Sequence, residues 1–350
     1  MPSDTPAAQG YRWPAEWEPH AATWLSWPKN ADTWPGRLER AIEAFVGIVR
    51  ALHPFERVNL LVDSPAREQA ARARLAAGGV PAGADVRFIL APTNDAWVRD
   101  YGPIFVVRGE GEQRERALLD FGYNAWGGKY PPFDLDDAIP AELARVLALP
   151  RFAADFVLEG GSIDGNGRGT LLTTETCLLH PNRGPGRTRE QMEERLAAWL
   201  GATQVLWLGE GIAGDDTDGH VDDIARFVDA GTLVAVVEDD PHDANAAPLA
   251  ANLRRLRGMR DAAGKPLAIA TLPMPPALFV AGQRCPASYA NFYLGNGVAL
   301  VPTFGAASDA RALAVLRELL PGREVVGVRC EELVYGLGAI HCLSQQEPRP

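Results

Sequence analysis

The chain has 350 residues, of which 47% are hydrophobic and 23% are charged, and its formal net charge is −11. This composition is that of a globular protein with a sizeable core. The acidic balance and the lack of a Lys/Arg tract argue against a nucleic-acid partner, because such binding needs clustered basic side chains.

Membrane and secretory segments are not expected either. No stretch approaches the roughly 20 apolar residues that cross a bilayer, and residues 1–14 have neither the basic nor the apolar region of a signal peptide. The cysteines form no CxxC pair; they are Cys177, Cys285, Cys330 and Cys342. We therefore expect reduced thiols, a cytoplasmic location and no membrane partner.

Strand-like and amphipathic helical runs alternate along the whole chain. In chain order, strands are predicted at 57–63, 85–92, 117–125, 169–179, 203–209, 266–274 and 324–330. A hairpin is predicted within 225–240 around Asp229–Gly231, and two strands within 287–305 are joined at Gly295–Gly297. The predicted helices are 67–79, 187–201, 245–258 and 309–322.

These elements indicate a mixed α/β fold. Each predicted helix comes with two or three strands, in units of roughly 60–80 residues. Strict alternation would favour a doubly wound sheet, but the hairpins favour a quasi-repeating α/β ring or propeller. No internal repeat is visible in the residues themselves. Because no low-complexity linker divides the chain, we expect one domain over 1–350, with 1–12 as a flexible N-terminus.

Polar segments interrupt the apolar runs at four places, where functional residues usually lie. They are NDAWVRDYGP (94–103), LEGGSID (158–164), GDDTDGHVDD (214–223) and GLGAIHC (336–342).

The acidic segment 214–223 allows several interpretations. An EF-hand loop fails, because the positions that would need Asp and Glu around Gly219 are Gly214 and Ala225. Asp218, His220 and Asp222 have the D-x-H-x-D spacing of di-metal ureohydrolases, but no second ligand set is present. A proton-transferring His220 beside an Asp that grips a cation is a further possibility, and a solvated acidic loop is the simplest.

Asp100 and Glu159 each lie next to an apolar run, where a carboxylate is costly unless it is paired or faces a ligand. An ion pair with a nearby arginine, Arg99 or Arg168, is the plain structural alternative. Gly160 and Gly161 would let the backbone approach a ligand closely.

Cys342 differs from the other cysteines. Glycines precede it, His341 adjoins it and polar residues follow, which is a setting for an accessible nucleophile as well as for a buried thiol. Cys177, Cys285 and Cys330 lie in surroundings that are typical of structural cysteines.

Taken together, these segments resemble the agmatine deiminase family, close to the bacterial-type peptidylarginine deiminases of the guanidine-modifying superfamily. The resemblance spans nearly the whole chain and is carried by eight segments: 14–28, 94–103, 121–137, 157–164, 169–179, 214–223, 286–305 and GAIHCLSQQEP at 338–348. It implies a single domain with the fold of a five-fold pseudosymmetric α/β propeller (pentein-like), with the site at its axis.

The resemblance also implies roles for individual residues. Cys342 matches the family's nucleophile and His220 its general acid/base. The carboxylates that hold the guanidinium match Asp100 and Asp222, and the acid beside the histidine matches Glu159. Trp97 matches an aromatic wall of the pocket, and Asn291 is expected to reach the site.

The implied reaction converts agmatine and water into N-carbamoylputrescine and ammonia through a covalent thiouronium on Cys342, with no metal or organic cofactor. Asp216 occupies the position where the family often has Glu, and Gly336–Ala339 departs from the family's usual Gly-Gly-Gly-Asn. The exact guanidine therefore stays open, with arginine, methylated arginine and peptidyl-arginine as alternatives. A metal-dependent ureohydrolase, and a non-catalytic binding propeller as in a related ribosome-binding factor, complete the alternatives. A homodimer is plausible for the family, but the sequence does not reveal an interface.

Overall fold

The structure is a computed structural model that describes residues 4–350. In this part of the chain, four three-stranded sheets share one plan, in which the first strand is antiparallel to the second and the second is parallel to the third. These sheets are β4 (Ile104–Arg108), β5 (Glu115–Gly122) and β6 (Arg151–Val157); β7 (Ile163–Gly165), β8 (Thr170–Thr174) and β9 (Gln204–Leu208); β10 (Ala225–Phe227), β11 (Thr232–Val237) and β12 (Ala268–Pro273); and β15 (Tyr293–Gly295), β16 (Val298–Thr303) and β17 (Glu324–Arg329).

A further sheet repeats this plan with strands from both ends of the chain. Its spatial order is β18 (Ser344–Pro348), β1 (His20–Ser26), β2 (Val58–Val62) and β3 (Val86–Leu90). β18 runs antiparallel to β1, with Leu25 opposite Ser344, and β2 runs parallel to β1. The two-stranded hairpin of β13 (Phe279–Val280) and β14 (Gln283–Arg284) stands apart.

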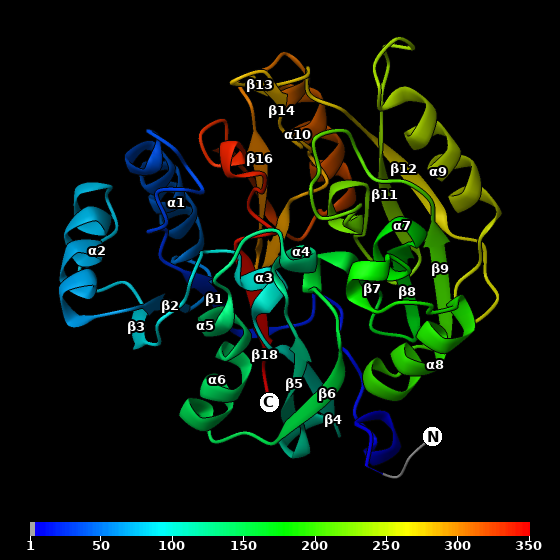
Figure 1. The fold of residues 1–350 in the computed structure, drawn as a ribbon, viewed down its shortest axis with the longest axis horizontal. Helices are drawn as coiled ribbons and strands as arrows, with labels where there is room; N and C mark the ends of the chain where they lie inside the picture. The colour runs from blue at the N-terminus through cyan, green and yellow to red at the C-terminus, as the bar shows by residue number, and fades with distance from the viewer. Residues whose placement is uncertain (1–3) are drawn as a thin grey trace.

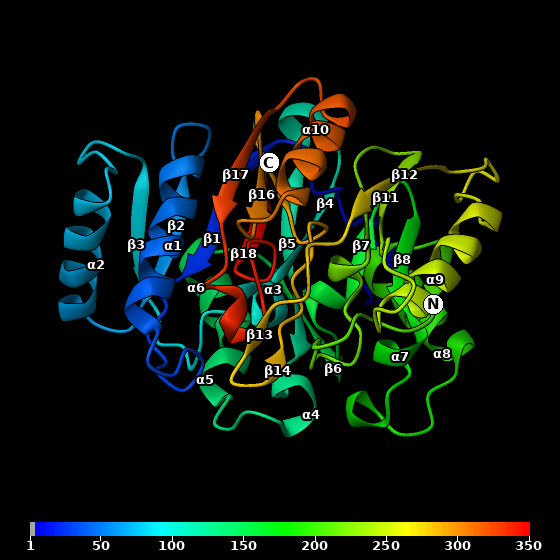
Figure 2. The same ribbon diagram turned by 90° about the horizontal axis from the view of Figure 1, so that it is seen from above.

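In each of these five units, the link between the second and the third strand contains one helix of nine residues or more, and parallel strands require such a crossover. These helices are α1 (Leu38–Leu52), α6 (Ile139–Leu147), α8 (Arg189–Leu200), α9 (Ala246–Gly258) and α10 (Ser308–Leu319). The remaining helices are α2 (Pro65–Ala77), α3 (Val98–Tyr101), α4 (Ala125–Gly128), α5 (Asp134–Asp137) and α7 (Glu175–Leu178). In Figures 1 and 2, α3 and β18 lie near the middle of the molecule, whereas α2, α8 and α9 lie at its periphery.

Local chemistry explains where these elements begin and end. Thr188 and Gln191 form a capping box at the start of α8, and Gly201 ends the helix with a left-handed φ of 72°. This confirms the helix predicted at 187–201. The strand predicted over 169–179 is correct only to Thr174, whose hydroxyl caps α7 by accepting a hydrogen bond from the Cys177 amide.

Other sequence predictions need correction in a similar way. Within 287–305 the strands begin only at Tyr293, and α1 and β1 were not predicted at all. Of the N-terminus expected to be flexible, 1–3 lie outside the described residues. From Tyr11 the chain is packed on the domain, because Tyr11 is buried and Arg12 forms a β-bridge with Val107.

The polar segments recur at one topological position. Each of five short segments lies just before the first strand of its sheet: Trp97–Asp100 before β4, 159–161 before β7, 220–222 before β10, Asn291 before β15 and Cys342 before β18. The backbone amide of Arg99 donates to the Cys342 carbonyl at 3.2 Å, which ties the first segment to the last. The shared position brings segments that are remote in sequence to one place.

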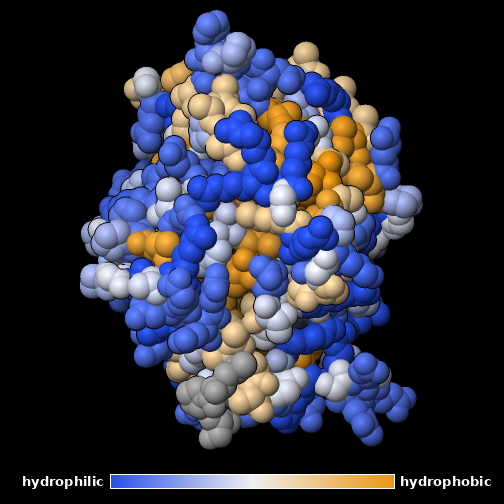
Figure 3. Space-filling model, turned by 90° about the vertical axis from the view of Figure 1, so that its right-hand side faces the viewer, coloured by the Kyte–Doolittle hydropathy of each residue, from blue (hydrophilic) through white to orange (hydrophobic). Residues whose placement is uncertain are grey.

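The outer surface is mainly polar. On the face that lies at the right of Figure 1, on the side of α8 and α9, hydrophilic side chains dominate and apolar residues form smaller areas (Figure 3). Within residues 4–350, none of the helices combines the length and the apolar character that crossing a bilayer requires.

Leu343 lies between Cys342 and β18, and its side chain is fully buried. We predict that Leu343→Ala lowers the free energy of unfolding by about 2–5 kcal/mol, because it leaves a cavity in a packed core. Urea unfolding followed by circular dichroism measures this. The matched control is Leu90→Ala, whose side chain is exposed, with an expected change below about 0.5 kcal/mol. Equal losses in the two variants would contradict the burial of Leu343 in the core.

Candidate active site

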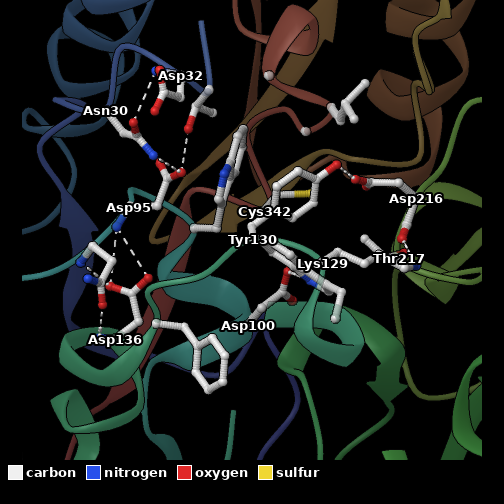
Figure 4. Close-up of a pocket in the computed structure, with 18 of the residues that line it drawn as sticks. Asn30, Asp32, Asp95, Asp100, Lys129, Tyr130, Asp136, Asp216, Thr217 and Cys342 are labelled. Carbon is white, nitrogen blue, oxygen red and sulfur yellow. Dashed lines mark hydrogen bonds between the residues drawn. The ribbon is translucent and has the colours of Figure 1, made fainter. Parts of the chain in front are cut away.

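A cavity of about 800 Å³ opens among the polar segments. Cys342, Asp100 and Asp216 face it together in Figure 4. Trp97 also lines it and packs against Trp34, with ring centroids 5.4 Å apart. The cavity is much larger than one guanidinium group, so it has room for a chain beyond the reacting carbon.

Asp100 lies on α3 and its carboxylate is fixed at both oxygens. The amide of Gly161 donates to Oδ1 at 2.9 Å, and the indole of Trp126 donates to Oδ2 at 3.1 Å. Burial raises the pKa of Asp100 to about 6, although the nearby His220 opposes this. Neither arginine considered from the sequence pairs with Asp100, because Arg99 turns towards Glu16 and Gln346.

A hydrogen bond from the backbone amide of His220 to the side chain of Asp215 fixes the loop that carries His220. The His220 amide donates to Asp215 at 3.0 Å, and its Nδ1 lies 3.7 Å from Asp100 Oδ1. Burial alone would lower the pKa of His220, but Asp100, Cys177 and Asp222 raise it well above its ordinary value. At neutral pH the ring therefore carries a proton that it can give away.

Glu159 lies close to His220, and only one of its two carboxylate oxygens has a hydrogen-bond partner. Its Oε1 accepts from Arg183 Nε at 2.9 Å, whereas its Oε2 is buried without a hydrogen-bond partner. The expected ion pair thus exists, but with Arg183 in place of Arg168. Arg183 was missed because it lies in a turn, PNR, with no motif around it.

Cys177 is buried as predicted, but it adjoins the site. Ligand atoms of Glu159, Cys177 and His220 lie within 4.8 Å of one another, which makes them the one metal-compatible group among residues 4–350. The guanidinium of Arg183, paired with Glu159, disfavours a divalent cation there. The D-x-H-x-D set does not converge either, because Asp218 bonds to Asn182, Lys129 and Arg183 while Asp222 bonds to His341.

Asp222 presents one free oxygen. Its Oδ2 lies 2.7 Å from His341 Nδ1, and its Oδ1 is buried without a hydrogen-bond partner. Burial would raise the pKa of Asp222, but His341 holds it below the ordinary value. The neighbouring Asp223 differs, because burial and the charge of Asp222 raise its pKa well above the usual range.

Cys342 is held by Asn291. The side-chain amide of Asn291 lies 3.1 Å from Sγ, and its carbonyl oxygen accepts from the amides of His341 and Cys342 at 3.0 and 3.4 Å. Burial raises the pKa of the thiol well above its ordinary value, and the charges of Asp222, Asp223 and Asp100 raise it further. The thiol is therefore protonated when the cavity holds no cation.

Gly161 forms the floor between these groups. A Cβ at this position would lie 2.6 Å from His220 Nδ1, 2.8 Å from Asp100 Oδ1 and 3.1 Å from Asp222 Oδ2. Only glycine leaves the space in which a planar cation could touch all three side chains.

Asp216 faces the outer part of the same cavity. Its Oδ2 accepts a hydrogen bond from the hydroxyl of Tyr130, and its carbonyl accepts one from Lys129 (Figure 4). Burial raises the pKa of Asp216 above its ordinary value. The described basic residues that line the cavity are all paired: Lys29 and Arg67 with Asp63, and Lys129 with Asp218. The cavity therefore favours a cationic ligand.

The structure thus brings all eight sequence-predicted residues into one region. Asp100, His220, Asp222, Asn291 and Cys342 form the inner part, Glu159 backs His220, and Trp97 and Asp216 line the cavity. The supporting residues Trp126, Arg183 and His341 were missed, although Trp126 and His341 lie inside segments that carried the resemblance.

Comparison with known proteins gives consistent matches over the whole chain. The sequence model of the Porphyromonas-type peptidyl-arginine deiminases matches residues 12–348. The agmatine deiminase of Pseudomonas aeruginosa (strain LESB58) is 38% identical over 372 residues, which covers 100% of this chain and 98% of that protein. The solved agmatine deiminase of Enterococcus faecalis is 35% identical with a TM-score of 0.92, covering 100% of this chain and 99% of that chain. The C. jejuni agmatine deiminase is 27% identical with a TM-score of 0.83, covering 97% and 96%.

We predict that Cys342 reacts slowly with iodoacetamide at pH 7, and about tenfold faster for each pH unit up to pH 9, because only the thiolate attacks. Asp222→Asn removes a charge that raises the thiol pKa, so alkylation at pH 8 should become faster. Mass spectrometry of the Cys342 peptide measures the rate. The control is Asp32→Asn, which changes another cavity carboxylate and should leave the rate unaltered. A rate already constant between pH 7 and 9 would contradict the raised pKa.

Proposed function

This chain belongs to the Porphyromonas-type peptidyl-arginine deiminase family, and we propose that it hydrolyses agmatine to N-carbamoylputrescine and ammonia. The observation that carries the proposal is the arrangement of Asp100, His220 and Asp222 around Gly161, with Cys342 Sγ 3.8 Å from Asp222 Oδ2. It offers two carboxylates, a proton donor and a thiol to one planar cation. Relatives at full coverage that are named agmatine deiminases support the choice of substrate.

The proposed reaction begins when the guanidinium enters between Asp100 and Asp222. Two carboxylates match its planar set of N–H donors and fix its orientation. Its positive charge offsets the negative charges that raise the pKa of Cys342, so the thiol loses its proton as the substrate binds. The ligand itself thus creates the nucleophile.

The thiolate of Cys342 then attacks the central carbon of the guanidinium. His220 gives its proton to one nitrogen, the C–N bond breaks and ammonia leaves, so a thiouronium stays on Cys342. The now neutral His220 takes one proton from water, whose oxygen attacks the same carbon. The thiolate leaves as the C=O bond forms, and it takes up the second proton of that water. The product carries a urea group. Glu159 keeps His220 in place, and no metal or organic cofactor takes part.

The amine end of agmatine is proposed to lie at Asp216. A carboxylate beside the Tyr130 hydroxyl suits an ammonium group. Substrates with an α-carboxylate, such as free arginine, would need an unpaired basic residue, whereas the described basic residues that line the cavity are already paired. Arginine, methylated arginine and peptidyl-arginine are therefore the weaker candidates.

The fold fits this proposal if the five sheets form a five-fold pseudosymmetric propeller in one domain. The repeated strand plan and the shared position of the polar segments support that arrangement. Catalytic groups from separate units would then meet at the axis. The cytoplasmic location, the absence of a nucleic-acid partner and a homodimeric assembly stay predictions from the sequence.

The direct test is ammonia release from agmatine, arginine, a methylated arginine and a peptidyl-arginine, with chelator-treated protein. We expect agmatine to be turned over, and Cys342→Ala to abolish the reaction because it removes the nucleophile. Cys285→Ala is the matched control, since Cys285 also lines the cavity, and should keep its turnover. Activity that survives Cys342→Ala but is lost with chelator would restore the metal-dependent alternative.

The amine site is tested by Asp216→Asn with two substrates. We expect the KM for agmatine to rise about 10- to 100-fold, since a charge-assisted hydrogen bond contributes roughly 1.5–3 kcal/mol. The KM for n-butylguanidine, which lacks the amine, should stay unchanged. Equal effects on both substrates would place the amine elsewhere, and Asp32→Asn serves as the control for a general loss of charge.

A further inference from the structure

His341 lies between two buried carboxylates. Its Nδ1 is 2.7 Å from Asp222 Oδ2, and its Nε2 is 2.9 Å from Glu16 Oε2. An ionised carboxylate can only accept hydrogen bonds, so each contact needs a proton on the ring nitrogen. A neutral imidazole has one such proton. Both contacts together therefore require either an imidazolium or a protonated carboxyl group.

The contacts of Glu16 favour the ring, rather than this carboxyl group, as the place of the extra proton. Glu16 lies 2.9 Å from Arg226 NH2 and 3.3 Å from Arg99 NH2, and its Oε1 accepts from the Leu294 amide at 2.9 Å. Burial would raise the pKa of Glu16, but Arg226, His341 and Arg99 hold it well below the ordinary value. Arg99 and Arg226 therefore keep Glu16 ionised at neutral pH, and His341 in turn lowers the pKa of Asp222.

Charge balance agrees with this assignment. The charged groups around His341 are Asp222, Glu16, Arg99, Arg226 and Asp164, with the Cys342 thiol beside it in the chain. All of them are buried. Within this group, a charged His341 gives three acids and three cations, whereas a neutral ring leaves three buried carboxylates with two arginines, which is costly. His220 is the further cation that acts on Asp222.

We propose that His341 is a positioning residue for the deimination, as an imidazolium that holds Asp222 Oδ2 and thereby aims its unpartnered Oδ1 at the guanidinium. The inference rests on the proposed function, because it assigns Asp222 to guanidine binding. Nδ1 acts on Asp222 directly. Nε2 binds the ring to Glu16, which lies 325 residues away in the sequence and is itself paired with Arg99 and Arg226.

The roles of the two ring nitrogens can be tested separately by substitution. The side-chain amide of Asn reaches about as far as Nδ1, and that of Gln about as far as Nε2. His341→Asn therefore keeps a donor for Asp222 and loses the bond to Glu16. His341→Gln keeps a donor for Glu16 and loses the bond to Asp222. The two variants have the same kind of polar side chain and differ only in which carboxylate keeps its hydrogen bond.

The experiment measures agmatine binding by calorimetry in a Cys342→Ala background, with thermal unfolding of each variant. We expect His341→Gln to weaken binding at least tenfold and His341→Asn less than threefold, even where their unfolding temperatures are alike. Equal weakening that follows the loss of stability would reduce His341 to a structural role and overturn the proposal. A Cys342→Ala parent that does not bind agmatine would contradict the proposed function instead.

Two further readouts are independent of that affinity. Nitrogen NMR of ¹⁵N-histidine-labelled protein should show one ring, absent in His341→Asn, with both nitrogens protonated at pH 7–8. A singly protonated ring would overturn the proposal whether or not agmatine is the substrate. In His341→Gln with Cys342 intact, the pKa of Asp222 should rise, so the acidic limb of kcat/KM should move to higher pH. An acidic limb that stays in place would count against the link between His341 and Asp222.

Discussion

Buried negative charge is the constraint on which the centre of this protein depends. Asp100, Glu159 and Asp222 are buried together with Glu16 and Asp164. Carboxylates cannot be taken from water into a protein interior without compensation. The chain therefore has to supply cations and N–H donors around these groups, and many features of the fold do so.

The compensation is incomplete. Arg183 pairs with Glu159, Arg226 pairs with Glu16 and Asp164, and His341 bonds to Asp222. Asp222 Oδ1, by contrast, has no hydrogen-bond partner, and the buried carboxylates raise the pKa of the Cys342 thiol. In the proposed reaction, a cationic substrate completes this charge balance. Substrate binding and the proposed activation of Cys342 are then one event, which suits a thiol that lies in the interior.

The fold brings these groups together by repetition. Each of the five sheets begins with a short strand, and the segment before that strand turns towards the same region. Because the last such strand, β18, pairs with β1, the C-terminus becomes part of the interior and Cys342 lies against α3. The sequence shows no repeat because each segment carries a different functional side chain, while only the strand plan is shared.

The sequence by itself determined the mixed α/β class, the helices α2, α8, α9 and α10, and the eight candidate site residues. Helix periodicity, glycine stops and polar segments between apolar runs are local signals, and the motifs that carry the resemblance are also local. Only the tertiary structure decided which arginine pairs with Glu159, that Cys177 adjoins His220, and that His341 joins Asp222 to Glu16. Those partners lie far apart in the chain, and an arginine or histidine has the same local appearance whether it faces water or a buried carboxylate. Their pairing follows from the burial of charge, which the sequence does not display until the chain is folded.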